Sequence, residues 1–269
     1  MAAGAVVAIL HIQEHRPLFL FACAPRSGST WLQRLFTAHG ILVWGEGSLL
    51  GLVSDVEPGK HWTADTPPAD APNWDLRHFR EHGHEMWMAV LKPKQCVRDA
   101  ALKVYLETVL GETARREGYR RWGLKETLWR PVEAEWVRKT WPASERIFMH
   151  RDPVTAFRSR FSKSYTPPAG LTQTQDQEQW WRGYLERTRY ALLACGPNDR
   201  LVRYERLRDE PDYRDALLRV CGVTPQPMEL SRIGWSEYRP LTAVETRLLE
   251  RHAAAAQELE AAFVTLEWS

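Results

Sequence analysis

The sequence predicts an α/β fold, in which a parallel sheet lies between two layers of flanking helices. Three observations predict it: short apolar runs of strand length, helical periodicity between them, and an alternation of the two through most of the 269 residues. A strand buried on both faces needs a continuous apolar run, and strands that alternate with helices build parallel βαβ units. The length suits one domain, so we expect residues 1–269 to form a single unit.

The first predicted strand covers residues 18–24 and is followed by Pro25. A helix is predicted over residues 30–39, closed by Gly40, and a second strand over residues 41–44. Helix starts are indicated by the cap Asp152-Pro153 and by the capping-box pair Thr242 and Glu245. The later strands are predicted over residues 121–125, 146–150 and 201–204.

The composition excludes several classes of protein. Apolar residues make up 44% and charged residues 26%, and the net charge is +2, so we expect a soluble globular protein that binds neither nucleic acid nor a membrane surface. The 4 cysteines lie far apart without a CxxC pair, which predicts neither a disulfide framework nor a zinc site. The apolar residues 1–10 lack a basic leader and are too short to span a bilayer, so we expect a cytoplasmic, bacterial-type protein. Most of the 13 tryptophans should be core residues, although some could line an aromatic pocket.

The segment between the first strand and the first helix is typical of an anion-binding loop. Small residues and one glycine, Gly28, let backbone amides and the helix N-terminus converge on one oxyanion. Charge-assisted hydrogen bonds contribute about 1.5–3 kcal/mol each, so four or five of them would hold such a group without a metal. The full segment reads Ala24-Pro25-Arg26-Ser27-Gly28-Ser29-Thr30-Trp31, in which Arg26 adds a positive charge and Ser27, Ser29 and Thr30 add hydroxyl donors.

A nucleotide loop of the Walker type would place a lysine at the helix entrance, in the pattern G-x-x-x-x-G-K-[ST]. Here Gly28 is followed by Ser29. The sequence therefore disfavours a kinase or NTPase that uses ATP with magnesium, which stays the alternative from another enzyme class. A catalytically silent binding protein with the same fold is a third possibility.

The loop resembles the 5'-phosphosulfate loop of the sulfotransferases that use 3'-phosphoadenosine-5'-phosphosulfate (PAPS). The P-R-S-G-[ST]-[ST] form is that of tyrosylprotein, carbohydrate and many bacterial members, whereas the cytosolic small-molecule branch typically carries lysine in place of Arg26. The resemblance implies a P-loop-containing nucleotide-binding fold. It also implies transfer of a sulfuryl group from PAPS to a hydroxyl or amine, with 3'-phosphoadenosine-5'-phosphate as product and no metal.

The family's second element is an arginine at a strand end with a serine eight residues on, which together bind the 3'-phosphate. Arg151 and Ser159 have this order and spacing. A guanidinium can contact a phosphate in bidentate fashion. Lys163 lies one helical turn past Ser159 and could reach the same phosphate, although the sequence favours a solvated helix face for this residue.

The family's V-x-Y-E-D-L segment, whose tyrosine borders the nucleotide, is similar to residues 202–207. Tyr204 matches that tyrosine, while Arg206 stands where the aspartate is usual. Arg239 is a candidate contact from a C-terminal basic loop of the kind that often closes over the nucleotide.

The resemblance implies Glu46 as the catalytic base, because related members carry a G-E pair at this distance from the loop. Glu46 follows Arg26 by twenty residues and comes just after the second predicted strand. Partial burial would raise its pKa from about 4.3 toward useful basicity. A histidine is the alternative base, with His84 of the cluster His78, His82 and His84 as the candidate.

Lys125 ends a predicted strand at the sheet edge where ligands of α/β proteins bind. In the family a strand-end lysine neutralises the transferring sulfuryl group, so Lys125 and Arg26 would share the charge that develops in the reaction. An ordinary ion pair with Glu126 is the other possibility. Residues 52–119 match no element of the family, and we expect a helical region there that forms the acceptor side. The acceptor would be a small molecule, a carbohydrate or a peptide, and no oligomeric state is predicted.

Overall fold

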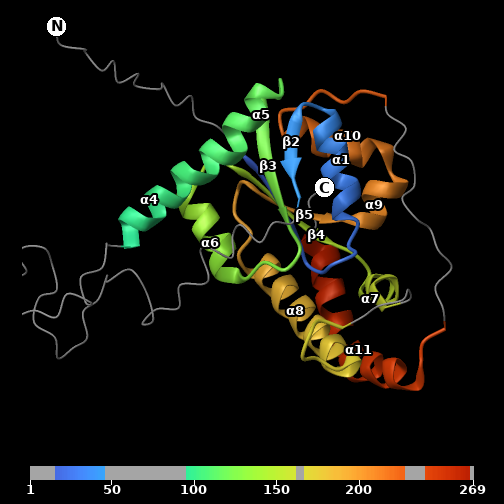
Figure 1. Cartoon of the computed structure of the whole chain (residues 1–269). Coiled ribbons are helices and arrows are strands. Elements are labelled where there is room, and N and C mark those ends of the chain that lie inside the picture. Colours follow the sequence, from blue (N-terminus) through green and yellow to red (C-terminus); the bar gives the residue numbers. More distant parts are fainter. Residues whose placement is uncertain (1–15, 46–94, 162–166, 228–239, 267–269) are drawn as a thin grey trace, which may run out of the picture.

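The computed structural model describes residues 16–45, 95–161, 167–227 and 240–266. At its centre the described chain forms one five-stranded parallel sheet with the strand order β2-β3-β1-β4-β5 (Figure 1). The strands are β1 (Leu18–Ala22), β2 (Ile41–Trp44), β3 (Arg121–Glu126), β4 (Glu145–His150) and β5 (Asp199–Arg203). The predicted α/β fold with a parallel sheet is therefore confirmed.

Helices connect the strands and cover both faces of the sheet. They are α1 (Ser29–Ala38), α4 (Gln95–Leu106), α5 (Thr113–Arg116), α6 (Pro131–Thr140), α7 (Pro153–Phe161), α8 (Gln173–Leu193), α9 (Tyr204–Asp209), α10 (Pro211–Val220) and α11 (Ala243–Leu266). A π-helical segment, η2 (Glu107–Glu112), joins α4 to α5. None of the described helices is both long and apolar enough to cross a membrane.

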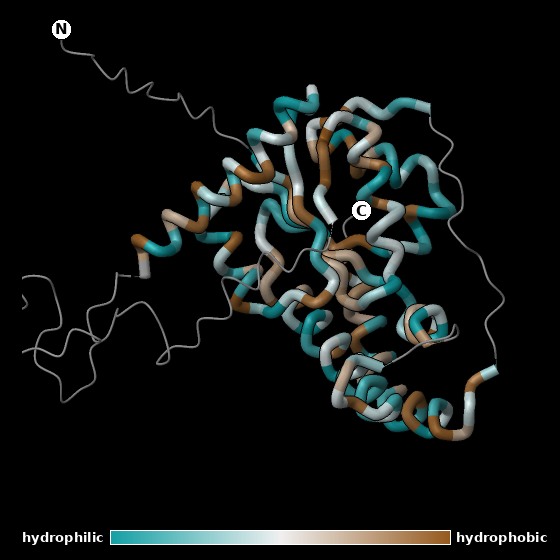
Figure 2. Tube along the Cα trace, viewed as in Figure 1, coloured by the Kyte–Doolittle hydropathy of each residue, from teal (hydrophilic) through white to brown (hydrophobic). Residues whose placement is uncertain are grey.

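The two faces of β1 belong to different core clusters, because successive side chains of a strand point to opposite sides. Leu18 and Leu20 pack with α1, α9 and α10, whereas Phe19 and Phe21 pack with the helices α4, α6, α8 and α11 of the other face. Figure 2 shows the apolar colour most clearly in β2, while the flanking helices carry both colours. This arrangement gives three layers and explains the unbroken apolar run of the first strand.

A third cluster lies beyond the carboxyl ends of the strands, where α7, α8 and α11 pack together (Figure 1). Its largest members are the aromatic residues Phe157, Phe161, Trp180, Trp181 and Tyr184. Six tryptophans from β3, α6, α8 and the connections on either side of α6 are buried, as expected for core residues. They are Trp122, Trp129, Trp136, Trp141, Trp180 and Trp181.

The local signals at helix ends correspond to observed caps. The Thr155 amide donates to Asp152 Oδ1 at 2.7 Å, so the acid caps α7 as predicted. The Thr242 amide donates to Glu245 Oε2 at 2.8 Å, and the Glu245 amide donates back to Thr242 Oγ1 at 3.3 Å. Several strand boundaries differ by one or two residues. β1 ends at Ala22 instead of residue 24. β5 covers Asp199–Arg203, so that Tyr204 is the first residue of α9 instead of a strand residue.

Candidate functional site

The candidate residues gather at one edge of the sheet because all strands run parallel. The loop 23–28 follows β1, Lys125 lies near the end of β3, and Arg151 and Tyr204 follow β4 and β5 directly. Carboxyl ends of parallel strands are where open α/β sheets bind ligands. Segments more than 170 residues apart in the sequence are thereby brought to one place.

The end of β1 is anchored on both sides before the loop begins. The Cys23 amide donates to the Met149 carbonyl at 2.9 Å, and the Cys23 carbonyl accepts from Arg187 Nε at 2.8 Å. Trp129 Nε1 donates to the Ala22 carbonyl at 2.8 Å. Because these groups bond within the protein, the loop starts from a fixed position.

The loop itself has an unusual backbone. Arg26 has a φ of 71°, and among the described residues it is the one non-glycine residue with a positive φ. Gly28 has a φ of 84° and is the N-cap of α1, whose first turn contains no acidic residue and receives no side-chain cap within the described chain. A helix N-terminus without an internal anion can bind an external one. Left-handed backbone at a non-glycine residue costs about 1–2 kcal/mol, and such strain is often found at functional sites.

The Ser27 hydroxyl has a role that the sequence did not predict. It donates to the Ala24 carbonyl and accepts from the Ala24 amide at 3.3 Å, and the residue is buried. Its side chain therefore joins the two ends of the turn 24–27. The hydroxyl proton that was expected to bind an anion is donated to the Ala24 carbonyl instead.

Gly28 gives room to Tyr204. A Cβ atom at position 28 would lie 2.1 Å from Cδ2 of the Tyr204 ring. The same ring also lies beside Arg151, whose guanidinium carbon is 4.8 Å from the ring centroid. Tyr204 therefore contacts both the loop and the arginine.

Arg151 and Ser159 both contact the loop. Arg151 Nη1 donates to the Arg26 carbonyl at 2.7 Å, and Arg26 Nε donates to Ser159 Oγ at 3.4 Å. The two predicted phosphate-binding elements therefore meet at the same sheet edge, joined by these two hydrogen bonds. A guanidinium group can bind a phosphate through two parallel hydrogen bonds.

Lys125 approaches the loop from the other side. Its Nζ donates to Thr30 Oγ1 at 3.2 Å, and the residue is only 4% exposed. A buried ammonium at the first turn of α1 adds its charge to the helix N-terminus. The sheet edge consequently has positive charge on both flanks of the loop.

A buried polar network supports the residues that precede Arg151 and Tyr204. His150 Nε2 lies 2.7 Å from the Tyr184 hydroxyl and 3.2 Å from Glu260 Oε2, while Arg203 Nη2 lies 3.1 Å from Glu260 Oε1. Burial, and to a smaller extent the charge of Arg203, lower the pKa of His150 to about 3, so the imidazole is neutral at pH 7. Helices α8 and α11 in this way fix the ends of β4 and β5.

Trp31 and Arg206 contact other parts of the protein, and several further predicted residues lie outside the described ranges. Trp31 is partly buried against the core cluster of α1, and Arg206 pairs with Glu210 at 2.9 Å. The structure describes the chain up to Gly45, one residue before Glu46. Outside the described residues lie Glu46, Lys163, Arg239 and the three histidines His78, His82 and His84.

Sequence reasoning missed Arg187, Trp129 and Tyr184, which hold the strand ends. Arg187 carried a usable signal, because it follows Trp180 by seven residues and so lies on the apolar face of α8. A buried arginine on such a face needs acceptors, and the Cys23 carbonyl is one of them. Trp129 carried no comparable signal, since its partner is a backbone carbonyl.

All 4 cysteines are free, and no group of three or more potential metal-binding His, Cys, Asp or Glu side chains occurs in the described part of the chain.

Comparison with known proteins gives one family. A family model described as the sulfotransferase family matches residues 17–227, which is more than half of the chain. Comparison with curated protein sequences gives no match.

Solved structures show the same fold at low sequence identity. A sulfotransferase from Alicyclobacillus acidocaldarius is 16% identical with a TM-score of 0.54, over 92% of this chain and 96% of that one. A sulfotransferase domain from the curacin biosynthetic pathway is 15% identical with a TM-score of 0.51, over 88% and 97% of the two chains. A sulfotransferase domain from the olefin synthase of Synechococcus PCC 7002 is 15% identical with a TM-score of 0.51, over 93% and 95%.

Proposed function

The chain belongs to the sulfotransferase family and is a sulfuryl-transferring enzyme, and we propose that its donor is PAPS. The observation that carries this proposal is the 2.7 Å hydrogen bond from Arg151 Nη1 to the Arg26 carbonyl. It joins the loop suited to a 5'-phosphosulfate with the arginine suited to a 3'-phosphate. A donor with phosphate groups at both positions matches two such elements, whereas ATP has no 3'-phosphate.

We assign the 5'-phosphosulfate to the loop amides around Gly28 and the positive end of α1. Arg26 and Lys125 would flank the bridging oxygen, where negative charge develops as the S–O bond to the phosphate breaks. Thr30, which accepts the hydrogen bond from Lys125, would hold that ammonium in place. This distribution supplies charge stabilisation from side chains and backbone amides.

The 3'-phosphate is assigned to Arg151 and Ser159. Tyr204 would pack along the nucleotide from its place between Gly28 and Arg151. Lys163 and Arg239 are assigned to the same nucleotide as further cationic contacts. Both lie outside the described ranges, so their assignment is carried by the sequence alone.

The acceptor reacts by in-line transfer with Glu46 as general base. Glu46 takes the proton of an acceptor hydroxyl or amine, the acceptor atom forms a bond to sulfur, and the electron pair of the broken S–O bond stays on the 5'-phosphate. The products are the sulfated acceptor and 3'-phosphoadenosine-5'-phosphate. Support for this base is its position two residues after β2, a strand whose carboxyl end lies at the site edge.

The test of the donor assignment compares two nucleotides that differ only in the 3'-phosphate. Arg151→Gln is expected to weaken binding of 3'-phosphoadenosine-5'-phosphate by about 100-fold, because a bidentate charged contact contributes about 1.5–3 kcal/mol per hydrogen bond. Binding of adenosine 5'-phosphate should change by less than about threefold, since it offers no group to this arginine. Isothermal titration calorimetry measures both affinities.

Arg208→Gln is the matched control for that test. Arg208 also lies near the Tyr204 ring, with its guanidinium carbon 5.9 Å from the centroid, but it pairs with Asp209. It should leave both affinities unchanged. Equal losses for both nucleotides in Arg151→Gln would mean that Arg151 only supports the loop, and the 3'-phosphate assignment would be wrong.

The acceptor class is found by screening. Sulfate transfer from labelled PAPS across phenols, aliphatic alcohols, amines, sugars and tyrosine peptides identifies which class this chain modifies. We expect transfer to a small molecule, a carbohydrate or a peptide.

A further inference from the structure

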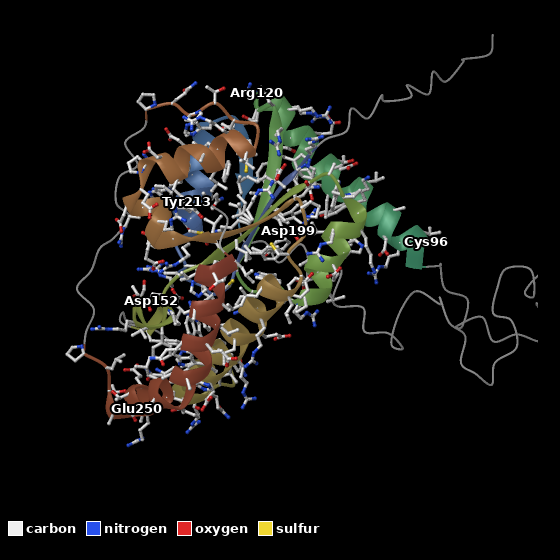
Figure 3. All side chains as sticks on the ribbon, turned by 180° about the vertical axis from the view of Figure 1, so that it is seen from behind. Cys96, Arg120, Asp152, Asp199, Tyr213 and Glu250 are labelled. Carbon is white, nitrogen blue, oxygen red and sulfur yellow. The ribbon has the colours of Figure 1, made fainter. Side chains whose placement is uncertain are left out.

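A second concentration of positive charge lies at the opposite edge of the sheet. Arg16 directly precedes the β1 region and Arg121 begins β3, so both stand at the amino ends of strands. Figure 3 labels Arg120 at the end of the molecule remote from Asp152, the residue that caps α7 at the candidate site. A pocket at this amino edge is lined by Arg16, Gly111, Arg115, Arg120, Arg121 and Trp122.

The amino edge is too far from the nucleotide site to belong to it. From Arg121 to Glu126 strand β3 spans about 17 Å, at about 3.3 Å per residue. The helical segment α4–η2–α5 contributes the remaining wall of the pocket through Gly111 and Arg115. We call this region the amino-edge pocket.

All charged residues that line the amino-edge pocket are arginines. Glu112 pairs with Arg115, and the charge of Glu145 acts on Arg121. Four guanidinium groups against these two carboxylates leave an excess of positive charge. Arg16, Arg115 and Arg120 are exposed and hence accessible to a ligand.

Two buried donors in the pocket wall have no acceptor within the described chain. Arg121 Nε donates to the Arg16 carbonyl at 2.8 Å and Nη1 donates to the Cys221 carbonyl, which fixes the guanidinium. Its Nη2 and the indole Nε1 of Trp122 are buried and find no partner among the described residues. Buried donors without acceptors cost free energy, so a ligand that supplies acceptors would be favoured here.

Gly111 lets the Trp122 indole lie close to the backbone of η2. A Cβ atom at position 111 would lie 3.0 Å from both Cδ1 and Nε1 of the Trp122 ring. A larger residue at position 111 would therefore press on the indole. The wall thus combines a small residue, an indole donor and arginine side chains.

We propose that the amino-edge pocket binds a phosphate-type oxyanion, either the free ion or the phosphate group of a larger molecule. Guanidinium groups match the planar acceptor pairs of such an anion, and charge-assisted hydrogen bonds are the strongest available to it. The pocket is separate from the nucleotide site and has no part in sulfuryl transfer. It gives this enzyme a second anion site on the far side of the sheet.

The test is a titration of inorganic phosphate followed by the indole N–H resonance of Trp122. Ionic strength is held constant with sodium chloride, and no nucleotide is added, so that the titrant is the only phosphate in the sample. We expect a saturable shift of this resonance. Arg115→Gln combined with Arg120→Gln should weaken phosphate binding by about tenfold or more.

The matched control is Arg182→Gln combined with Arg189→Gln, which removes the same charge from exposed positions of α8. It should leave the Trp122 titration unchanged. An absent or non-saturating shift, or equal weakening by the two double variants, would overturn the proposal. The Trp122 resonance reports on its own pocket, so the titration remains interpretable if phosphate also binds at the nucleotide site or if the proposed donor is wrong.

Methyl phosphate distinguishes the two sources of the anion. Binding as strong as that of inorganic phosphate supports a phosphate group carried on a larger molecule, because one oxygen can then be esterified. Binding of inorganic phosphate alone supports the free ion. If neither shifts the Trp122 resonance, the pocket is not an anion site.

Discussion

Gly28→Ala is expected to weaken binding of 3'-phosphoadenosine-5'-phosphate by at least about 100-fold, since two or more charge-assisted hydrogen bonds of about 1.5–3 kcal/mol would be lost. The added methyl group would lie 2.1 Å from Cδ2 and 2.3 Å from Cε2 of Tyr204, so the ring or the loop must move. Movement of the ring removes the stacking partner of Arg151, and movement of the loop displaces the amides. Calorimetric titration of the folded variant measures the loss.

Gly118→Ala is the control that separates the contact from the backbone strain. Gly118 has a φ of 82°, close to the 84° of Gly28, but a Cβ atom there would meet nothing within 4 Å. Both variants should lose about 1–2 kcal/mol of folding free energy, which is the cost of an L-residue in the left-handed region. Only Gly28→Ala should lose nucleotide binding. Unchanged binding in Gly28→Ala would show that the loop does not hold the nucleotide.

Glu46→Gln should lower kcat by about 10²–10⁴-fold, which is the usual contribution of a positioned general base. Glutamine keeps the size of the side chain but cannot accept the acceptor proton. The affinity for 3'-phosphoadenosine-5'-phosphate should stay within about twofold of the unaltered enzyme, because the proposed role of Glu46 concerns the acceptor and not the nucleotide. Steady-state transfer from labelled PAPS gives kcat, and calorimetry gives the affinity.

The competing base is tested in parallel. His84→Gln should retain turnover if Glu46 takes the proton. Full turnover in Glu46→Gln together with loss in His84→Gln would move the role to the histidine. A pH profile of kcat adds a second readout, since the acidic limb set by the base should disappear in the variant that lacks it.

The sheet and its order of elements could be predicted because burial on two faces leaves a plain signal. Phe19 and Leu20 point into opposite core clusters, and such positions require the continuous apolar run that the sequence has. The turn after β1 was equally predictable, since small residues and a glycine between a strand and a helix favour a tight turn at the helix N-terminus. Boundaries depended on tertiary pairing: β5 starts at Asp199, where its carboxylate pairs with the buried Arg146 across the sheet.

The contacts inside the site were less predictable, because each is a single hydrogen bond or ring contact between residues that lie far apart in the sequence. The proximity of Tyr204 to Gly28 depends on the start of α9 directly after β5. The local sequence pattern did not predict that start. The Ser27 hydroxyl was assigned to a ligand by its residue type, whereas the turn uses it to bond Ala24. Composition gave a small net charge and could not reveal that arginines concentrate at the amino edge of the sheet.

The most direct test is a comparison of two nucleotides by thermal unfolding of the unaltered protein. At about 100 times its dissociation constant, 3'-phosphoadenosine-5'-phosphate should raise the unfolding temperature by about 5–10 °C, because that excess stabilises the folded state by about 2.7 kcal/mol. ATP with magnesium at the same concentration should give a clearly smaller rise, since it offers no 3'-phosphate to Arg151. Stabilisation by ATP with magnesium and none by the doubly phosphorylated adenosine would contradict the account and indicate a kinase or NTPase.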